Sequence, residues 1–206
     1  MKITINSQSS IRVEGKKVLW FDPYQVKTAP HDADIIFLTH MHHDHYSPED
    51  IEKVAKDSTI FVVPKTMAEE FPPEKVLFLC PGDKTTLPGF PVTAVSAYNP
   101  NKPFHPRENG WLGYLVNVDG ELLYVCGDTD ATPEAMAVKC DVLALPVGGT
   151  YTMDAVQAAK LAKAISPKLA IPTHYGSIVG KKADAERFRD LVKDAMQVEL
   201  LVEDAN

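Results

Sequence analysis

The first half of the chain consists of short apolar or alternating segments separated by polar turns, a pattern typical of β-strands. It predicts strands at residues 2–6, 10–13, 17–21, 34–39, 59–63, 75–80 and 91–97, with a turn at Glu14-Gly15. One helix interrupts this series. Ser47 is a suitable N-cap, Pro48 follows it, and apolar residues then recur at helical spacing, so the helix should run from about 48 to 57.

The second half alternates strands with amphipathic helices. It predicts strands at residues 112–118, 121–126, 142–147, 169–172 and 198–202, with a turn at Asp119-Gly120. Thr152 is the candidate N-cap of a helix with Ile165 on its apolar face, and another helix should run from about 182 to 195. Because no repeat or linker is visible, we expect one domain over residues 1–206.

Composition and charge narrow the class of protein. With 45% hydrophobic residues, the chain can bury a sizeable core, and its net charge of −7 without any basic run makes nucleic acid a poor candidate partner. No signal-like segment or membrane-length apolar run is visible, and Cys80, Cys126 and Cys140 are too widely spaced to suggest disulfides. We therefore expect a soluble, cytoplasmic protein that acts on a small molecule, and we make no prediction of its oligomeric state.

Polar side chains that can bind metal follow four of the predicted strands. They are Asp22, the segment from Thr39 to His45, Asp128 and His174. The segment alone holds four imidazoles and a carboxylate within seven residues, and both groups are ligands of zinc and similar divalent ions. If the strand ends converge on one edge of a sheet, the four places form a shared pocket.

These markers resemble the metallo-β-lactamase superfamily. The motif H-x-H-x-D-H is His40 to His45, G-D-T is Gly127-Asp128-Thr129, and the late histidine lies in Pro172-Thr173-His174-Tyr175. The resemblance implies an α/β fold, a four-layer αββα sandwich of two mixed sheets with outer helices. The compact branch of lactonase-like and N-acyl phosphatidylethanolamine phospholipase D-like hydrolases is the most similar.

The resemblance also implies two metal ions. It assigns His40 and His42 to a first ion, Asp44, His45 and His174 to a second, and Asp128 to both, with Asp22 orienting a ligand from behind. Zn²⁺ is the first candidate, and Mn²⁺, Fe²⁺ or Ni²⁺ are alternatives. A hydroxide between the ions would then cleave an ester, phosphodiester, lactone or amide bond.

The first ion needs another histidine, and here the sequence departs from the family pattern. Similar proteins carry it directly after a strand, where this chain has Ser96-Ala97-Tyr98-Asn99. We expect His105, in the irregular stretch 98–110, to be this ligand. The alternatives are a surface histidine with an incomplete first site, or Asn99 as a weak substitute.

Asp44 and Asp128 are the candidate catalytic carboxylates. Other side chains have more ambiguous roles. Tyr151, which follows a predicted strand, is a further catalytic candidate that contacts the substrate or an oxyanion; the alternative is that it packs beneath the start of the next helix. Tyr175 and Arg107 are weaker candidates of the same kind, and we assign no role to His31 or to His43, which should point away from the metals.

The favoured function is therefore a metal-dependent hydrolase. Oxygen-reducing members of the superfamily have a motif similar to H-x-E-x-D. This chain has His42 in place of the glutamate, which favours hydrolysis over redox chemistry. The alternatives are a non-catalytic metal-binding or interaction protein with the same fold, and a nuclease of the same superfamily, which the acidic balance disfavours.

Overall fold

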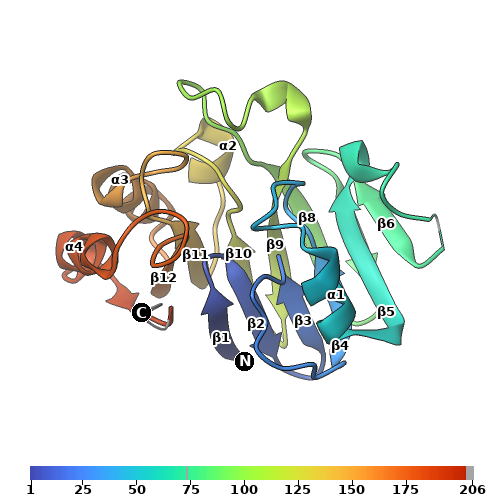
Figure 1. Cartoon of the computed structure of the whole chain (residues 1–206). Helices are drawn as coiled ribbons and strands as arrows, with labels where there is room; N and C mark the ends of the chain where they lie inside the picture. Colours follow the sequence, from blue (N-terminus) through green and yellow to red (C-terminus); the bar gives the residue numbers. More distant parts are fainter. Residues whose placement is uncertain (73, 203–206) are drawn as a thin grey trace.

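The structure, a computed structural model, describes residues 1–72 and 74–202 and contains two facing β-sheets with helices outside them (Figure 1). The first sheet has the order β1 (Lys2–Ser7), β2 (Ser10–Glu14), β3 (Val18–Phe21), β4 (Ala33–Phe37), β5 (Ala55–Pro64) and β6 (Val76–Leu79). The second has the order β13 (Gln197–Val198), β12 (Leu169–Thr173), β11 (Val142–Pro146), β10 (Glu121–Val125), β9 (Leu112–Val118), β8 (Phe90–Ser96) and β7 (Lys84–Leu87).

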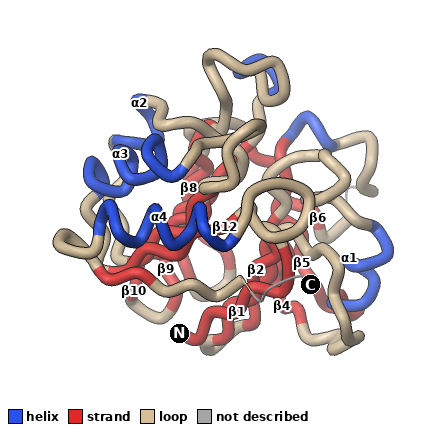
Figure 2. The backbone as a smooth tube through the Cα atoms, turned by 60° about the vertical axis from the view of Figure 1, so that its left-hand side comes forward, coloured by secondary structure: helices blue, strands red, loops and turns tan. Residues whose placement is uncertain are grey.

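Helices complete the outer layers. Helix α1 (Pro48–Val54) packs on the outer face of the first sheet, and α2 (Pro133–Met136), α3 (Ala155–Ile165) and α4 (Lys182–Val192) cover that of the second. Figure 2 shows α3 and α4 side by side on that face. The predicted αββα sandwich is confirmed. In the described part of the chain, no helix is long and apolar enough to cross a membrane.

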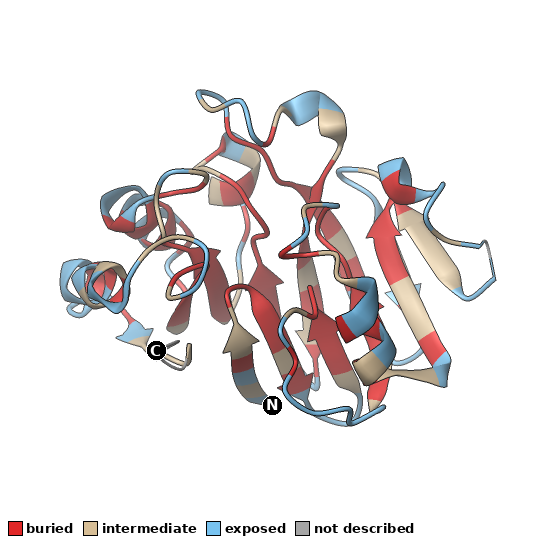
Figure 3. Ribbon diagram, in the orientation of Figure 1, coloured by how far each residue is buried: buried red, intermediate tan, exposed pale blue. Residues whose placement is uncertain are grey.

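The core between the sheets forms because alternate residues of the strands are apolar and pack between the two sheets. Figure 3 shows buried residues along the strands of both sheets. Phe21 of β3 stacks on Phe37 of β4 with ring centroids 4.7 Å apart, and Tyr114 of β9 contacts Phe37 at 5.1 Å. The Tyr114 hydroxyl donates a hydrogen bond to the carbonyl oxygen of Leu38 at 2.6 Å. This bond ties the second sheet to the chain just before the His-rich segment.

Several predicted boundaries differ from the structure. The helix expected over 48–57 ends at Val54, the helix over 182–195 ends at Val192, and the strand over 198–202 is reduced to β13. The first helix is shorter because Ala55 already pairs with Ala33 of β4. Strand β7 and helix α2 were not predicted. The β7 sequence is mostly polar, and it is a strand because it pairs with β8.

The predicted cap of α3 is wrong. Asp154, not Thr152, is the N-cap: its side chain accepts hydrogen bonds from the backbone N–H groups of Val156 and Gln157, at 2.9 and 2.8 Å. The Gln157 side chain accepts in turn from the Asp154 N–H at 3.0 Å, which completes a capping box. The Asp-x-x-Gln spacing was therefore the stronger signal.

Replacing Asp154 with alanine should lower the free energy of unfolding by about 1 kcal/mol, because two N–H groups of α3 lose their acceptor. Urea unfolding followed by circular dichroism measures the change. Asp190→Ala removes a carboxylate that is 63% exposed on α4 and should change stability by less than about 0.5 kcal/mol. Equal losses in the two variants would contradict the capping role.

Candidate metal centre

The histidines and aspartates singled out in the sequence lie together at one end of the two sheets. They follow the ends of different strands: the His-rich segment follows β4, the loop with His105 follows β8, Asp128 follows β10 and His174 follows β12. Strands β10, β11 and β12 are mutually parallel, so their ends meet at one edge. Among the candidate ligands, the side chain of His42 is half-buried and the others are buried: His40, Asp44, His45, His105, Asp128 and His174.

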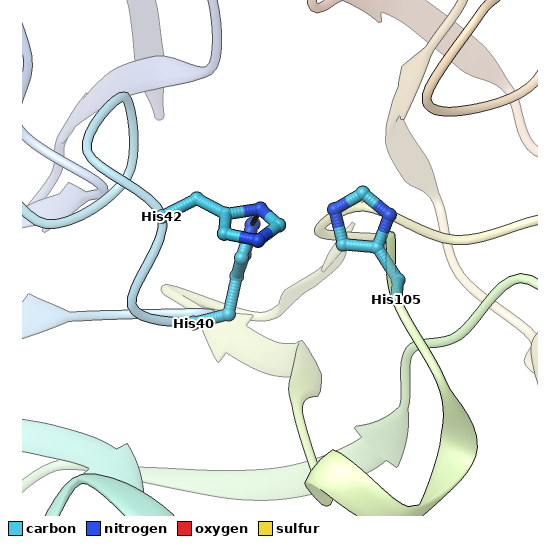
Figure 4. Close-up of side chains that lie close together, drawn as sticks. All are labelled: His40, His42 and His105. Carbon is cyan, nitrogen blue, oxygen red and sulfur yellow. Dashed lines mark hydrogen bonds between the residues drawn. The ribbon is translucent and has the colours of Figure 1, made fainter. Parts of the chain in front are cut away.

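One group consists of His40, His42 and His105, whose potential ligand atoms lie within 4.8 Å of one another. Nε2 of His40 is 3.1 Å from Nδ1 of His42. Figure 4 shows that His40 and His42 come from the same segment and that His105 faces them from another loop, the one before the 3₁₀ turn η2 (Arg107–Asn109). His105 therefore lies beside His40 and His42, although it comes from a later point in the sequence than the family pattern has it.

A second group consists of Asp44, His45 and His174, again with ligand atoms within 4.8 Å. Oδ2 of Asp44 lies 3.4 Å from Nε2 of His45 and 3.4 Å from Nε2 of His174. The two imidazole rings are nearly parallel, with an interplanar angle of 21° and centroids 5.5 Å apart. One carboxylate oxygen and two ring nitrogens thus face a common point.

Asp128 lies between the two groups. Its Oδ2 is 3.1 Å from Nε2 of His105 and 3.0 Å from Nε2 of His174, and its Oδ1 is 3.4 Å from Nε2 of His45. A carboxylate in this position can contact ions held by either group.

The unsatisfied atoms of the centre match a cation. Nε2 of His45, His105 and His174 and Oδ1 of Asp128 are buried, and none has a hydrogen-bond partner among the described residues. Buried polar atoms in folded proteins almost always have partners. Imidazole nitrogen and carboxylate oxygen are ligands of zinc and related ions, so divalent cations would satisfy these atoms together.

The opposite ring nitrogen of His45 is held from behind. Asp22 is 1% exposed, and its carboxylate lies 2.7 Å from Nδ1 of His45. The same carboxylate accepts hydrogen bonds from the backbone N–H and the hydroxyl of Thr39, at 2.8 and 2.6 Å. Asp22 therefore fixes the ring so that Nε2 faces the centre, and it lies where the resemblance put it, behind a candidate ligand.

Two amide side chains do the same for other imidazoles, and the sequence did not predict their roles. Asn99 Oδ1 lies 2.5 Å from Nδ1 of His105, so Asn99 is behind the ring and not, as the alternative had it, in place of the imidazole. Gln8 Nε2 lies 3.4 Å from Nδ1 of His174, and the Gln8 carbonyl accepts a hydrogen bond from the His174 N–H at 2.9 Å. Each partner restrains the orientation of one histidine.

Three residues of the centre have a left-handed backbone. Gln8, Asp22 and His174 have φ angles of 51°, 47° and 58°. Such conformations cost roughly 1–3 kcal/mol outside glycine and concentrate at functional sites. At Asp22 and His174 they occur directly after a strand, where the chain turns sharply.

Burial and neighbouring charges set the protonation states. Burial, reinforced by the nearby His45, lowers the pKa of His40 well below its ordinary value. Burial raises the pKa of Asp128, but His174 and His45 outweigh it and hold that pKa well below its ordinary value. Burial lowers the pKa of His174, but Asp128 raises it to about 9. A neutral imidazole and an ionised carboxylate can bind a cation directly, whereas His174 would first release a proton.

A cavity of about 210 Å³ opens onto the centre. Its walls include His42, His43, Asp44, Phe104, His105, Asp128, Tyr151, His174 and Ile178. Tyr151 is half-buried and contacts Phe104 edge-to-face, with centroids 4.7 Å apart. It lines the cavity and does not pack beneath α3.

The other residues considered in the sequence belong to neither of the two groups of candidate metal ligands. Tyr175 is 1% exposed in the core beneath α3 and α4, and the Arg107 side chain is 65% exposed and pairs with Glu134 at 2.5 Å. His31 is on the surface. His43 is exposed on the cavity wall but belongs to none of the metal-competent groups.

Trp111 is a further residue of the centre that the sequence did not reveal. It is 6% exposed, and its ring packs against those of His40 and His42, with centroids 4.8 Å away in both cases. It therefore restricts the movement of two candidate ligands.

The sequence matches the β-lactamase superfamily domain over residues 2–174. The chain belongs to the metallo-β-lactamase superfamily. This membership confirms the resemblance carried by the motifs. Because the match covers most of the chain, it extends well beyond the His-rich segment.

Several related proteins match this chain over most of the length of both chains. It is 31% identical to a UPF0173 metal-dependent hydrolase of Thermoplasma acidophilum, over 93% of this chain and 90% of that one. A structure from Parabacteroides distasonis, described as a candidate metal-dependent hydrolase, has a TM-score of 0.86 and 31% identity and covers 98% of this chain and 93% of its own. A Thermotoga maritima structure of the metallo-β-lactamase superfamily shares the fold, with a TM-score of 0.62, 22% identity and coverages of 92% and 84%.

Proposed function

We propose that this protein is a single-domain hydrolase that depends on two divalent metal ions, with Zn²⁺ as the first candidate and Mn²⁺, Fe²⁺ or Ni²⁺ as alternatives. The observation that carries the proposal is the convergence of imidazole and carboxylate side chains on a cavity, with four of their buried polar atoms lacking a hydrogen-bond partner among the described residues. The description of relatives as metal-dependent hydrolases supports it. The ligands would be His40, His42 and His105 for one ion, and Asp44, His45 and His174 for the other, with Asp128 in contact with both.

Bound ions would polarise the attacked group and lower the pKa of bound water toward about 7. In hydrolysis, the water oxygen bonds to the carbonyl carbon or phosphorus, the bond to the leaving group breaks, and a proton moves from water to that group. Asp44 and Asp128 line the cavity, and their ionised carboxylates can accept hydrogen bonds from the water and orient it for attack. Tyr151, on the cavity wall, would donate a hydrogen bond to the developing oxyanion.

Metal analysis combined with turnover assays tests the proposal. The purified protein should bind two ions per chain and hydrolyse at least one of a set of generic ester, lactone, amide and phosphodiester substrates, and a chelator should remove the activity. Tight metal binding without turnover on any substrate would instead indicate a non-catalytic metal-binding protein.

The cysteines bear on the compartment. Cys80, Cys126 and Cys140 form no disulfide, and burial raises the pKa of the Cys126 thiol well above its ordinary value and that of Cys140 to about 12. Thiols with such pKa values are poor nucleophiles at neutral pH. As part of the proposal we place the protein in the cytoplasm, where thiols are kept reduced.

His105→Ala should reduce metal content from two ions per chain to one. The first ion loses a direct ligand, so its affinity should fall by more than the roughly 10- to 100-fold that loss of an outer partner causes. Mass spectrometric metal analysis after dialysis, with chelator competition, measures both quantities. His31→Ala, at an exposed histidine, is the control and should keep two ions. Two tightly bound ions in His105→Ala would rule out this ligand.

A further inference from the structure

The cavity over the metal centre changes character from its base to its mouth. Imidazoles and carboxylates form the base. At the mouth, Phe104 and Ile178 present apolar side chains that are 41% and 40% exposed, and Tyr151 contacts the Phe104 ring. Large apolar side chains exposed together around a concave site mark a place for the apolar part of a ligand.

These three side chains come from three loops that are far apart in the sequence. Phe104 lies in the loop between β8 and β9, Tyr151 between β11 and α3, and Ile178 between β12 and α4. None of them belongs to the three apolar clusters that the described residues form in the interior. Their position at the mouth is therefore not explained by packing of the core.

The part of the chain that the structure describes places no long basic side chain in the wall of this cavity. Among the described residues that line it there is neither lysine nor arginine. Two basic residues of the adjacent loop are engaged elsewhere: Lys102 Nζ lies 2.5 Å from Asp130 and 2.7 Å from the carbonyl oxygen of Thr152, and Arg107 pairs with Glu134. Sites that select phosphoryl groups commonly surround them with arginine or lysine.

We infer that the substrate is an uncharged carboxylic ester, lactone or amide with a short aliphatic or aromatic group that binds among Phe104, Tyr151 and Ile178. The inference rests on the proposed hydrolase function. It excludes phosphodiesters from the bonds that the hydrolase would cleave. The apolar group is short because about 210 Å³ is less than the roughly 300 Å³ at which pockets for drug-sized ligands begin.

A series of p-nitrophenyl esters with one leaving group tests the inference on the metal-loaded, full-length protein. From acetate to butyrate, kcat/KM should rise about 4-fold per methylene, or roughly 15-fold in all, and octanoate should add little. The hemisuccinate, which ends in a carboxylate at similar length, should be at least about 10-fold poorer than butyrate, because it places a charge against an apolar wall.

The possible outcomes separate the inference from the function on which it rests. A hemisuccinate turned over as well as butyrate, or bis(p-nitrophenyl) phosphate turned over as fast as the butyrate, would overturn the inference and leave the hydrolase in place. No turnover of any ester or phosphodiester, in protein that binds two ions, would overturn the proposed function itself.

Two variants test whether the preference for butyrate over acetate depends on the apolar residues at the cavity mouth. Phe104→Ala and Ile178→Ala should each reduce the butyrate-to-acetate ratio of kcat/KM from roughly 15 to roughly 4 or less, because part of the apolar wall is lost. Val156→Ala is the matched control: Val156 is also apolar and 48% exposed, but it lies on α3 outside the cavity lining, so the ratio should not change. An unchanged ratio in both mouth variants would overturn the inference.

A binding measurement without turnover completes the test. The probe is 4-phenyl-2-butanone, an uncharged ketone that cannot be hydrolysed, observed by saturation-transfer NMR with and without Zn²⁺. Its phenyl protons should be saturated by the unaltered protein and by Val156→Ala, and the signal should fall at least about 3-fold in Phe104→Ala. Equal signals in all three proteins would contradict binding at the mouth.

Discussion

Asp128→Asn should lower kcat/KM by roughly 1000-fold, the upper end of the effect of losing one electrostatic stabiliser. Asp128 is 4% exposed, and its two oxygens lie within 3.4 Å of Nε2 atoms from both groups of the centre. Asparagine keeps the shape but removes the charge and replaces one oxygen with an NH₂ group that cannot bind a cation. Steady-state kinetics on the best ester, with metal analysis, measures the loss.

The control for this variant is Asp57→Asn, which changes an exposed aspartate on β5. It should keep two ions and the full kcat/KM. Thermal unfolding of both variants distinguishes loss of function from loss of fold. If Asp128→Asn bound two ions and kept more than about a tenth of its activity, the shared role of Asp128 would be excluded.

The strand ends of this fold could be located from the sequence because two strong constraints act on them. Buried strands give recognisable apolar runs, and few residue types bind divalent ions. Asp128 and His174 were therefore visible as isolated metal-competent residues directly after such runs, and the structure brings both to the centre. Their proximity to each other depended on the topology, which the resemblance supplied.

The restraining amides could not be predicted because their roles depend on contacts between distant segments. Gln8 lies in the turn between β1 and β2 and meets His174, 166 residues later in the chain. Asn99 lies in a long loop, and its neighbour His105 is identified only once that loop is folded. Glutamine and asparagine in turns are ordinary, so residue type alone indicates nothing.

The cavity mouth was invisible for a related reason. Phe104 and Ile178 are single apolar residues in loops, where neither a helical nor a strand period applies. Isolated exposed apolar residues are common on protein surfaces. Only their arrival at the same opening, beside Tyr151, gives them significance, and that arrangement carries the substrate inference.

The largest loss of stability is expected from Asp22→Ala. The Asp22 carboxylate accepts hydrogen bonds from the Thr39 N–H and hydroxyl and lies 2.7 Å from Nδ1 of His45, all in the buried interior. Its removal leaves these groups without their partner, at about 1–3 kcal/mol for each buried unsatisfied group. The free energy of unfolding should therefore fall by roughly 3–5 kcal/mol, as measured by urea denaturation of the metal-free protein.

Asp22→Asn separates the two roles of this residue. The amide oxygen can still accept from Thr39, so the stability loss should be smaller, at about 1–2 kcal/mol. The amide has only one oxygen left to orient both Thr39 and His45, so metal affinity should still fall by roughly 10- to 100-fold. Asp22 does not line the cavity, so its effect on metal acts through the groups that it holds: the ring of His45, and Thr39, whose hydroxyl lies 3.0 Å from Nδ1 of His40. An unchanged metal affinity in Asp22→Asn would mean that the imidazole is held by its packing alone.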